Sequence, residues 1–129
     1  IPVFVIDPYF FSPKRAQELP HRMQFLLDGL EALSKNIAHK GSRLICVEGK
    51  STEVIPKLAK SFQVDRVVAH RLVEPFGQKR DQIITDALDV PFELFEGETL
   101  HPPGLLRTGK GTPFGVFTPF SKSKLRKFI

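Results

Sequence analysis

Residues 1–8 read Ile-Pro-Val-Phe-Val-Ile-Asp-Pro, an apolar run of strand-forming residues that stops at an acid followed by a proline. A run with no alternation of apolar and polar residues predicts a parallel strand buried on both faces, in a sheet that helices cover on both sides. Asp7 then stands at the carboxyl end of this strand. Ligands bind at that edge of open α/β sheets, so the stretch predicts both a fold class and the rim where a site should lie.

The residues that follow supply helices and further strands. Apolar residues recur at three- and four-residue steps from Pro20 to Ala38, and Gly41 ends this predicted helix. The other predicted elements are a strand over 44–47, a helix from about residue 51, a strand over 66–69, a helix ending near residue 88 and a strand over 92–95. This alternation predicts an α/β fold, a Rossmann-like three-layer sandwich whose parallel strands are joined by right-handed crossovers.

The composition is that of one globular domain. Of the 129 residues, 41% are hydrophobic and 26% are charged, and no apolar run approaches the length of a membrane span. The single cysteine, Cys46, falls in a predicted strand, where we expect a small buried hydrophobe. A lone cysteine is compatible with a reducing compartment, so we expect a cytoplasmic protein with no membrane partner.

The chain divides into two parts of different composition. Every Asp and Glu lies within residues 1–98, which hold the predicted α/β domain, whereas residues 99–129 are rich in glycine and proline and are basic. The second part predicts an extended loop, with room for a small hairpin, that leads outward from the domain. Its positive charge is either a solvated surface or a contact with phosphate or with another part of the protein.

Two loops follow strands at the predicted ligand rim. The first places three aromatic residues between two prolines, and the second is a loop over 70–77. Exposed aromatics here either pack on a neighbouring helix or partner domain, or form a stacking surface for a planar ligand. The candidate binding residues on this rim are Asp7, Tyr9, Phe10, Phe11, Arg71, Glu74, Phe76 and Gly77.

Other known site patterns are weak or absent. Gly49-Lys50-Ser51 after a strand suggests a phosphate loop, but Leu44 stands where that motif needs a glycine. A turn glycine with Ser51 as a helix N-cap is the favoured interpretation. The glycines match no dinucleotide fingerprint, and the four histidines have no paired spacing, so no metal site is predicted.

Several segments match one family in order along nearly the whole chain. They are Val3–Pro8, Phe25–Leu30, Gly41–Leu44, Glu48-Gly49, Glu74–Gly77 with Arg80-Asp81, Pro102–Gly104 and Val116–Phe120. The most specific are Glu-Pro-Phe-Gly at 74–77 and Val-Phe-Thr-Pro-Phe at 116–120. In this order the chain resembles the amino-terminal domain of DNA photolyases and cryptochromes.

The resemblance implies a five-stranded parallel sheet of order 3-2-1-4-5 that holds a light-harvesting antenna chromophore against a helical FAD-binding domain. In that family the antenna passes excitation to reduced FAD, which splits pyrimidine dimers in DNA. The chain is then expected to be the antenna-binding part of a deoxyribodipyrimidine photolyase, with the eight rim residues bordering the antenna. Its implied partners are the helical FAD domain of the same polypeptide and damaged DNA. A cryptochrome photoreceptor, a generic nucleotide-binding module and a basic nucleic-acid-binding module remain as alternatives.

Two departures from the family pattern carry further expectations. Folate-binding members have a glutamate near the position of Gly77, so the resemblance favours a deazaflavin or flavin antenna over folate. The family's first strand, which lies in the middle of its sheet, would precede Ile1 and is absent from this chain. We therefore expect a truncated piece with a gap between the strand at Ile1 and the strand at Arg66, and no DNA repair by this piece alone.

Overall fold

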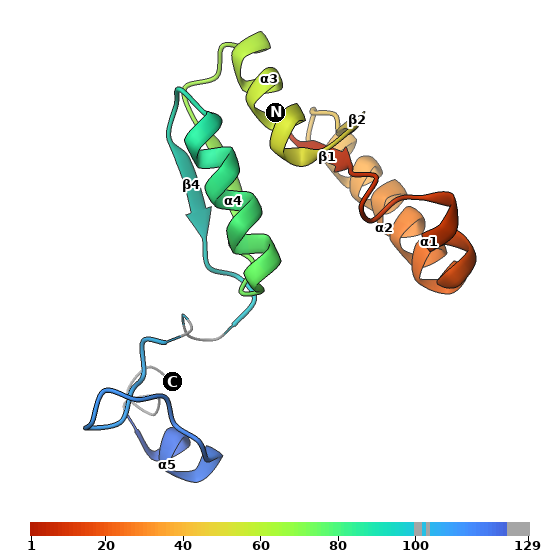
Figure 1. The fold of residues 1–129 in the computed structure, drawn as a ribbon. Helices are drawn as coiled ribbons and strands as arrows, with labels where there is room; N and C mark the ends of the chain where they lie inside the picture. The colour runs from red at the N-terminus through yellow and green to blue at the C-terminus, as the bar shows by residue number, and fades with distance from the viewer. Residues whose placement is uncertain (100–101, 103, 124–129) are drawn as a thin grey trace.

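The structure is a computed structural model, and it describes residues 1–99, 102 and 104–123 (Figure 1). Short strands alternate with helices in its first part, as the sequence predicts, and the strand bounds lie within two residues of the predicted ones. In chain order the elements are β1 (Val3–Ile6), α1 (Pro13–Glu18), α2 (Pro20–His39), β2 (Ile45–Glu48), α3 (Ser51–Ser61), β3 (Val67–His70), α4 (Pro75–Ala87), β4 (Phe92–Phe95) and α5 (Phe117–Lys122).

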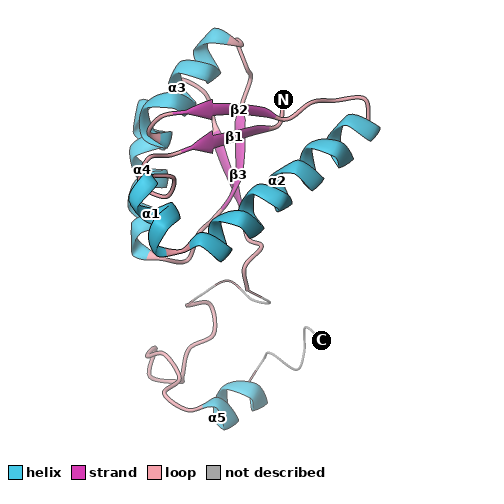
Figure 2. Ribbon diagram, turned by 90° about the vertical axis from the view of Figure 1, so that its right-hand side faces the viewer, coloured by secondary structure: helices cyan, strands magenta, loops and turns pink. Residues whose placement is uncertain are grey.

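The described strands form two separate parallel pairs. β1 pairs with β2, with Val3 opposite Ile45, and β3 pairs with β4, with Val67 opposite Phe92. Figure 2 shows the two pairs as distinct ribbons that run in different directions. The gap expected between the strand after Ile1 and the strand at Arg66 is therefore present, and it divides the sheet.

Helices lie on both sides of this divided sheet. From β1 the chain passes through α2 to β2, on one side of β1. It then returns through α3 to β3, on the other side of β1. Right-handed crossovers in opposite directions place their helices on opposite faces of a sheet. α4 packs against α3, so these two helices share one face and α2 covers the other (Figure 2). The three-layer α/β architecture is thus confirmed.

The core is small because the middle of the sheet is open. Among the described residues, Ala59 and Ile84 are the only buried apolar side chains, 7% and 3% exposed. A cavity of about 830 Å³ lies between β1 and β3 and is lined by both strands and by the helices around them. The prediction that β1 is buried on both faces is therefore wrong. Its four residues are half-buried, since one of its edges borders this cavity.

One further expectation is corrected at the edge of the fold. Cys46 is exposed rather than buried, because side chains on the edge strand β2 alternate in exposure and Cys46 lies on the exposed side with Glu48. In the second part of the chain, Thr108 and Thr112 close a tight turn, and α5 follows. The basic residues Lys124, Arg126 and Lys127 lie outside the described residues, as does Pro103. Within the described part, no helix is long and apolar enough to cross a membrane.

Candidate functional site

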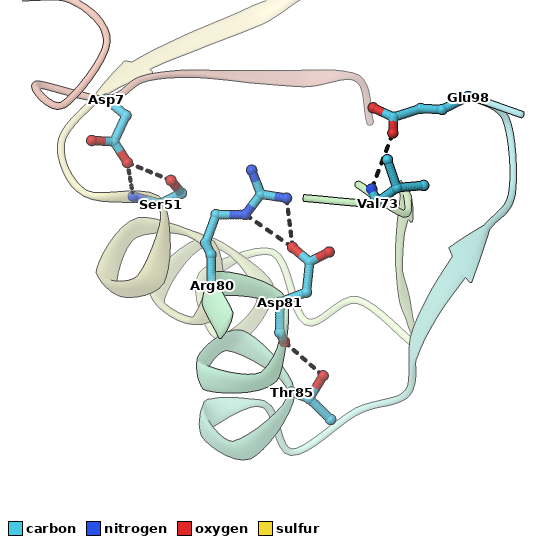
Figure 3. Close-up of polar contacts among 7 residues, drawn as sticks. All are labelled: Asp7, Ser51, Val73, Arg80, Asp81, Thr85 and Glu98. Atoms are coloured by element: carbon cyan, nitrogen blue, oxygen red, sulfur yellow. Dashed lines mark hydrogen bonds and ion pairs between the residues drawn. The ribbon is translucent and has the colours of Figure 1, made fainter. Parts of the chain in front are cut away.

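Asp7 connects the end of β1 to the start of α3. Its Oδ2 accepts hydrogen bonds from the Ser51 amide at 2.9 Å and from the Ser51 hydroxyl (Figure 3). Its Oδ1 accepts one from the Tyr9 amide at 3.0 Å. The prediction of Ser51 as N-cap is wrong. Lys50 occupies the cap position without a side-chain hydrogen bond, and α3 begins at Ser51. A carboxylate from the neighbouring strand therefore satisfies a free amide of the first turn.

These contacts set the ionisation of Asp7. Partial burial disfavours the charged carboxylate, but the hydrogen bonds from Ser51 and Tyr9 outweigh it, with a smaller contribution from the charge of Arg80. The pKa of Asp7 is consequently below its ordinary value. Asp7 is thus a charged structural anchor of the rim, and its oxygens are already engaged within the protein.

The two rim loops meet in an aromatic cluster, formed by Tyr9, Phe10 and Phe76. Tyr9 stacks on Phe76 with ring centroids 4.5 Å apart and an interplanar angle of 17°, and Phe10 meets both rings edge-on. The guanidinium of Arg15 lies 5.9 Å from the centre of the Tyr9 ring. All three rings remain about half exposed, Tyr9 at 53%. The cluster is thus a preformed apolar surface with a positive charge beside it.

The other predicted rim residues do not join this cluster. Phe11 turns inward and packs edge-on against Phe4, with centroids 5.6 Å apart. Arg71 forms an ion pair with Glu96, with Nε 3.0 Å from the carboxylate. Glu74 is exposed at the position that precedes α4. The predicted rim thus divides into an aromatic surface and residues that hold the loops in place.

Gly77 also has a structural role. The predicted loop over 70–77 is shorter than expected, because α4 begins at Pro75 and so includes Phe76 and Gly77. Gly77 is buried, and a Cβ on it would lie 2.5 Å from Cβ of Leu72. Its lack of a side chain therefore allows the first turn of α4 to pack closely on the loop after β3.

The sequence analysis named one polar pair near the site, Arg80 and Asp81, only as part of the family match and not as site residues. Arg80 donates from Nε and Nη2 to Oδ1 of Asp81, at 2.9 and 2.5 Å (Figure 3). Asp81 is 3% exposed, and its Oδ2 has no hydrogen-bond partner in the part of the chain that is described. Helical spacing was the available signal, since Asp81 lies three residues before Ile84 on the apolar face of α4.

Both Arg80 and Asp81 line the cavity between β1 and β3, as do Tyr9 and Phe10. The aromatic cluster and the buried pair therefore border the same open space, one at the rim and one inside. Among the described residues, no three histidine, cysteine, aspartate or glutamate side chains are grouped to hold a metal ion.

Comparisons with known proteins identify the family of this chain and support its fold. The family model described as DNA photolyase matches residues 1–129. A deoxyribodipyrimidine photo-lyase of Synechococcus is 31% identical over 127 residues, which is 95% of this chain and 26% of that protein. Cryptochrome-2 of Gallus gallus is 35% identical over 82 residues, 64% of this chain and 14% of that protein.

Among solved structures, the archaeal photolyase of Sulfolobus tokodaii, described with two FAD molecules, superimposes with a TM-score of 0.72 at 25% identity. The match covers 84% of this chain and 25% of that one. The chain therefore spans about a quarter of the length of the photolyases it matches. With an α/β fold, rim loops and a family match over its whole length, this chain belongs to the DNA photolyase family.

Proposed function

We propose that this chain is the antenna-chromophore-binding domain of a light-driven deoxyribodipyrimidine photolyase. The observation that carries the proposal is the family match over residues 1–129, together with a fold like that of a photolyase. Because the chain covers only a quarter of such proteins, the repair activity belongs to the longer polypeptide. A helical FAD-binding domain of that polypeptide and damaged DNA are its proposed partners, and residues 99–129 lead from residues 1–98 toward the helical domain.

The aromatic cluster is the proposed wall of the antenna site. Tyr9 and Phe76, stacked on each other, form an exposed apolar surface beyond the carboxyl ends of β1 and β3, where ligands of open α/β sheets bind. A planar chromophore that stacks on such rings gains about 1–3 kcal/mol per ring, by analogy with bases on aromatic side chains. Arg15 beside Tyr9 supplies positive charge for an anionic group on the chromophore.

We favour a deazaflavin or flavin antenna over folate. A glutamate at position 77 is the feature that the family resemblance associates with folate, and here that position is a buried glycine packed on Leu72. A carboxylate could not be placed there without displacing the Leu72 side chain. The Sulfolobus tokodaii photolyase, described with two FAD molecules, gives a precedent in the family for a second flavin.

The test is the chromophore content of the intact protein and of two matched variants. Tyr9→Ala with Phe76→Ala should release the antenna while FAD stays bound, because only the rim surface is removed. Phe25→Ala is the control, since Phe25 of α2 is an exposed ring, 80% exposed, that does not belong to the aromatic cluster. Absorption and chromatography of the released chromophores give the result. If the rim variant keeps its full antenna complement, the chromophore binds elsewhere.

A cryptochrome photoreceptor is the second candidate. It is favoured by the match to Cryptochrome-2 of Gallus gallus, which extends over 82 residues, 64% of this chain. The two candidates differ in chemistry rather than in this domain's fold. Intact protein that repairs thymine dimers in blue light is a photolyase, and intact protein that holds FAD but never repairs them is a cryptochrome.

A further inference from the structure

The second rim loop, residues 71–74, leads from β3 into α4 and so determines where Phe76 lies. Phe76 is the second residue of α4. It stands between Pro75, whose ring fixes its own φ angle, and Gly77, which packs on Leu72 of the loop. The position of the Phe76 ring therefore follows the position of this loop and of the first turn of α4.

Val73 is the residue of this loop that is held at both of its backbone polar groups. Its amide donates to Oε2 of Glu98 at 3.0 Å (Figure 3). Its carbonyl accepts from Nε2 of Gln78, also at 3.0 Å. The amide of Gln78 in turn donates to the carbonyl of Glu74, so Gln78 belongs to the first turn of α4. Glu98 therefore holds the loop directly and the start of α4 through Gln78.

The neighbours of Glu98 hold the same loop. Residues 96–98 directly follow β4, whereas the loop directly follows β3. The side chain of Arg71 pairs with Glu96, with Nε 3.0 Å from the carboxylate. The imidazole of His70 lies against Gly97, where a Cβ would overlap it. Residues 96–98 thus form a clamp on the end of β3 and on the second rim loop.

The exposure of this clamp indicates that it positions the loop rather than stabilises the fold. Glu98 is exposed, and the paired side chains of Arg71 and Glu96 are 49% and 34% exposed. Exposed ion pairs contribute little to the free energy of unfolding. The pairing of β3 with β4 ends at His70 and does not depend on these side chains. Loss of the Glu98 carboxylate should therefore leave the fold intact and release the loop.

The placement of the loop matters because the aromatic cluster spans both rim loops. Tyr9 comes from the first loop and Phe76 from the start of α4, and their ring centroids lie 4.5 Å apart at an interplanar angle of 17°. The stack exists only while both loops hold their places. A binding surface that is already ordered binds more tightly, since the ligand does not have to order it.

We propose that Glu98 is a positioning residue of the antenna site. Its carboxylate holds Val73, and Gln78 extends that hold to the start of α4. Phe76 thereby stays stacked on Tyr9 in the arrangement that receives the chromophore, which Glu98 itself does not touch. This inference rests on the proposed antenna function, and the first of its two tests needs no chromophore.

Three variants separate positioning from stability. Glu98→Ala removes the acceptor of the Val73 amide, whereas Glu98→Gln keeps an oxygen that can accept from it. Glu93→Ala is the matched control, because Glu93 of β4 pairs with Arg66, with Nη1 3.3 Å from the carboxylate. Arg66 directly precedes β3, so this second pair also joins β4 to the β3 segment, but at the end away from the rim.

The first test is fluorine NMR of the intact protein, freed of antenna, with 4-fluorophenylalanine at position 76. Tyr9→Ala marks the resonance of the unstacked ring, because it removes the ring current of Tyr9. Glu98→Ala should move the resonance toward that position, Glu98→Gln should largely restore it, and Glu93→Ala should leave it unchanged. An unmoved resonance in Glu98→Ala, or an equal movement in Glu93→Ala, would overturn the proposal.

The second test is fluorescence titration of the same antenna-free protein with FMN and with 5-deazariboflavin. The probe that binds more tightly should bind Glu98→Ala roughly threefold to tenfold more weakly, as for the loss of one hydrogen bond. FAD content and the thermal midpoint should not change, and Glu93→Ala should bind as the unaltered protein does. Unchanged affinity of Glu98→Ala would overturn the positioning role. If neither probe binds the unaltered protein, the flavin-type antenna proposal fails, and the fluorine resonance still decides whether Glu98 positions Phe76.

Discussion

At the scale of single residues, Asp7 and Gly77 show how rim positions can serve the fold. Asp7 ends β1 and holds the first turn of α3 through Ser51, so one carboxylate fixes two elements. Gly77 lets α4 start against Leu72. Both were predicted from the sequence as ligand contacts because they stand at the carboxyl rim. The position of a residue in the sheet predicts that it lies at the rim. It does not predict that its contacts are already made within the protein.

Removing the Asp7 carboxylate should destabilise the chain. Asp7→Ala leaves the Ser51 amide and hydroxyl without their acceptor, and we expect a loss of roughly 1–3 kcal/mol in the free energy of unfolding. Urea denaturation followed by circular dichroism measures it. Glu31→Gln should have almost no effect, since that carboxylate is exposed. An unchanged midpoint for Asp7→Ala would contradict the anchoring role.

The lowered pKa of Asp7 predicts an acid-dependent stability. Because the folded-state pKa lies below the ordinary value of 3.8, the stabilisation is complete above that value and is lost as the pH falls through the folded-state pKa. The free energy of unfolding of Asp7→Asn should therefore fall less steeply in acid than that of the unaltered chain. The difference between the two free energies should be largest at neutral pH. Denaturation midpoints across the acid range give the comparison, and parallel curves for the two proteins would show that Asp7 does not titrate with folding.

Gly77→Ala should destabilise the start of α4. The added methyl would lie 2.5 Å from Leu72, and overpacking of this kind costs roughly 1–3 kcal/mol. Gly29→Ala is the matched control, because a Cβ there meets nothing within 4 Å and alanine favours a helix interior by about 0.8–1.0 kcal/mol. Thermal denaturation should move in opposite directions for the two variants. A second substitution, Leu72→Ala, should partly restore Gly77→Ala by making room.

At the scale of elements, the apolar runs and helical spacing predicted the order of β1, α2, β2, α3, β3, α4 and β4. The shifts in bounds have local causes. The predicted loop over 70–77 ends early because α4 begins at Pro75, and proline is favourable in the first turn of a helix. Cys46 was predicted to be buried because its strand is apolar, but an edge strand exposes alternate side chains. Apolar composition predicts a strand, and its neighbours decide how deeply it is buried.

Amide exchange should report the edges of β1 and β3 that have no strand partner among the described residues. In β1 the amides of Phe4 and Ile6 face β2 and should exchange slowly, whereas that of Val5 should exchange quickly. In β3 the amides of Val67 and Ala69 face β4 and should be slow, with Val68 fast. NMR-detected hydrogen exchange resolves this alternation. Uniform protection along both strands would mean that the edges are already covered.

At the scale of the whole molecule, the open middle of the sheet dominates the energetics. Only two apolar side chains of the described residues are buried, and a cavity of about 830 Å³ lies where the strands would meet. The family resemblance predicted the gap, and strand periodicity alone could not, because periodicity does not give strand order. It also could not predict the Tyr9–Phe76 stack, which joins residues far apart in the sequence.

A hollow core predicts low stability for this chain by itself. Hydrophobic burial is the main favourable contribution to folding, so a domain that leaves its centre open should unfold at low urea and bind hydrophobic dyes. A sharp transition at high urea, with no dye binding before it, would contradict this account of the core.

The central claim, that this chain is a photolyase antenna domain, is tested most directly by the action spectrum of thymine-dimer repair by the intact protein. We predict two bands, one from reduced FAD and one from the antenna, and the selective loss of the antenna band in the Tyr9→Ala, Phe76→Ala variant. Repair by the FAD band alone should persist in that variant. An action spectrum identical in the two proteins, or the absence of any light-driven repair, would contradict the claim.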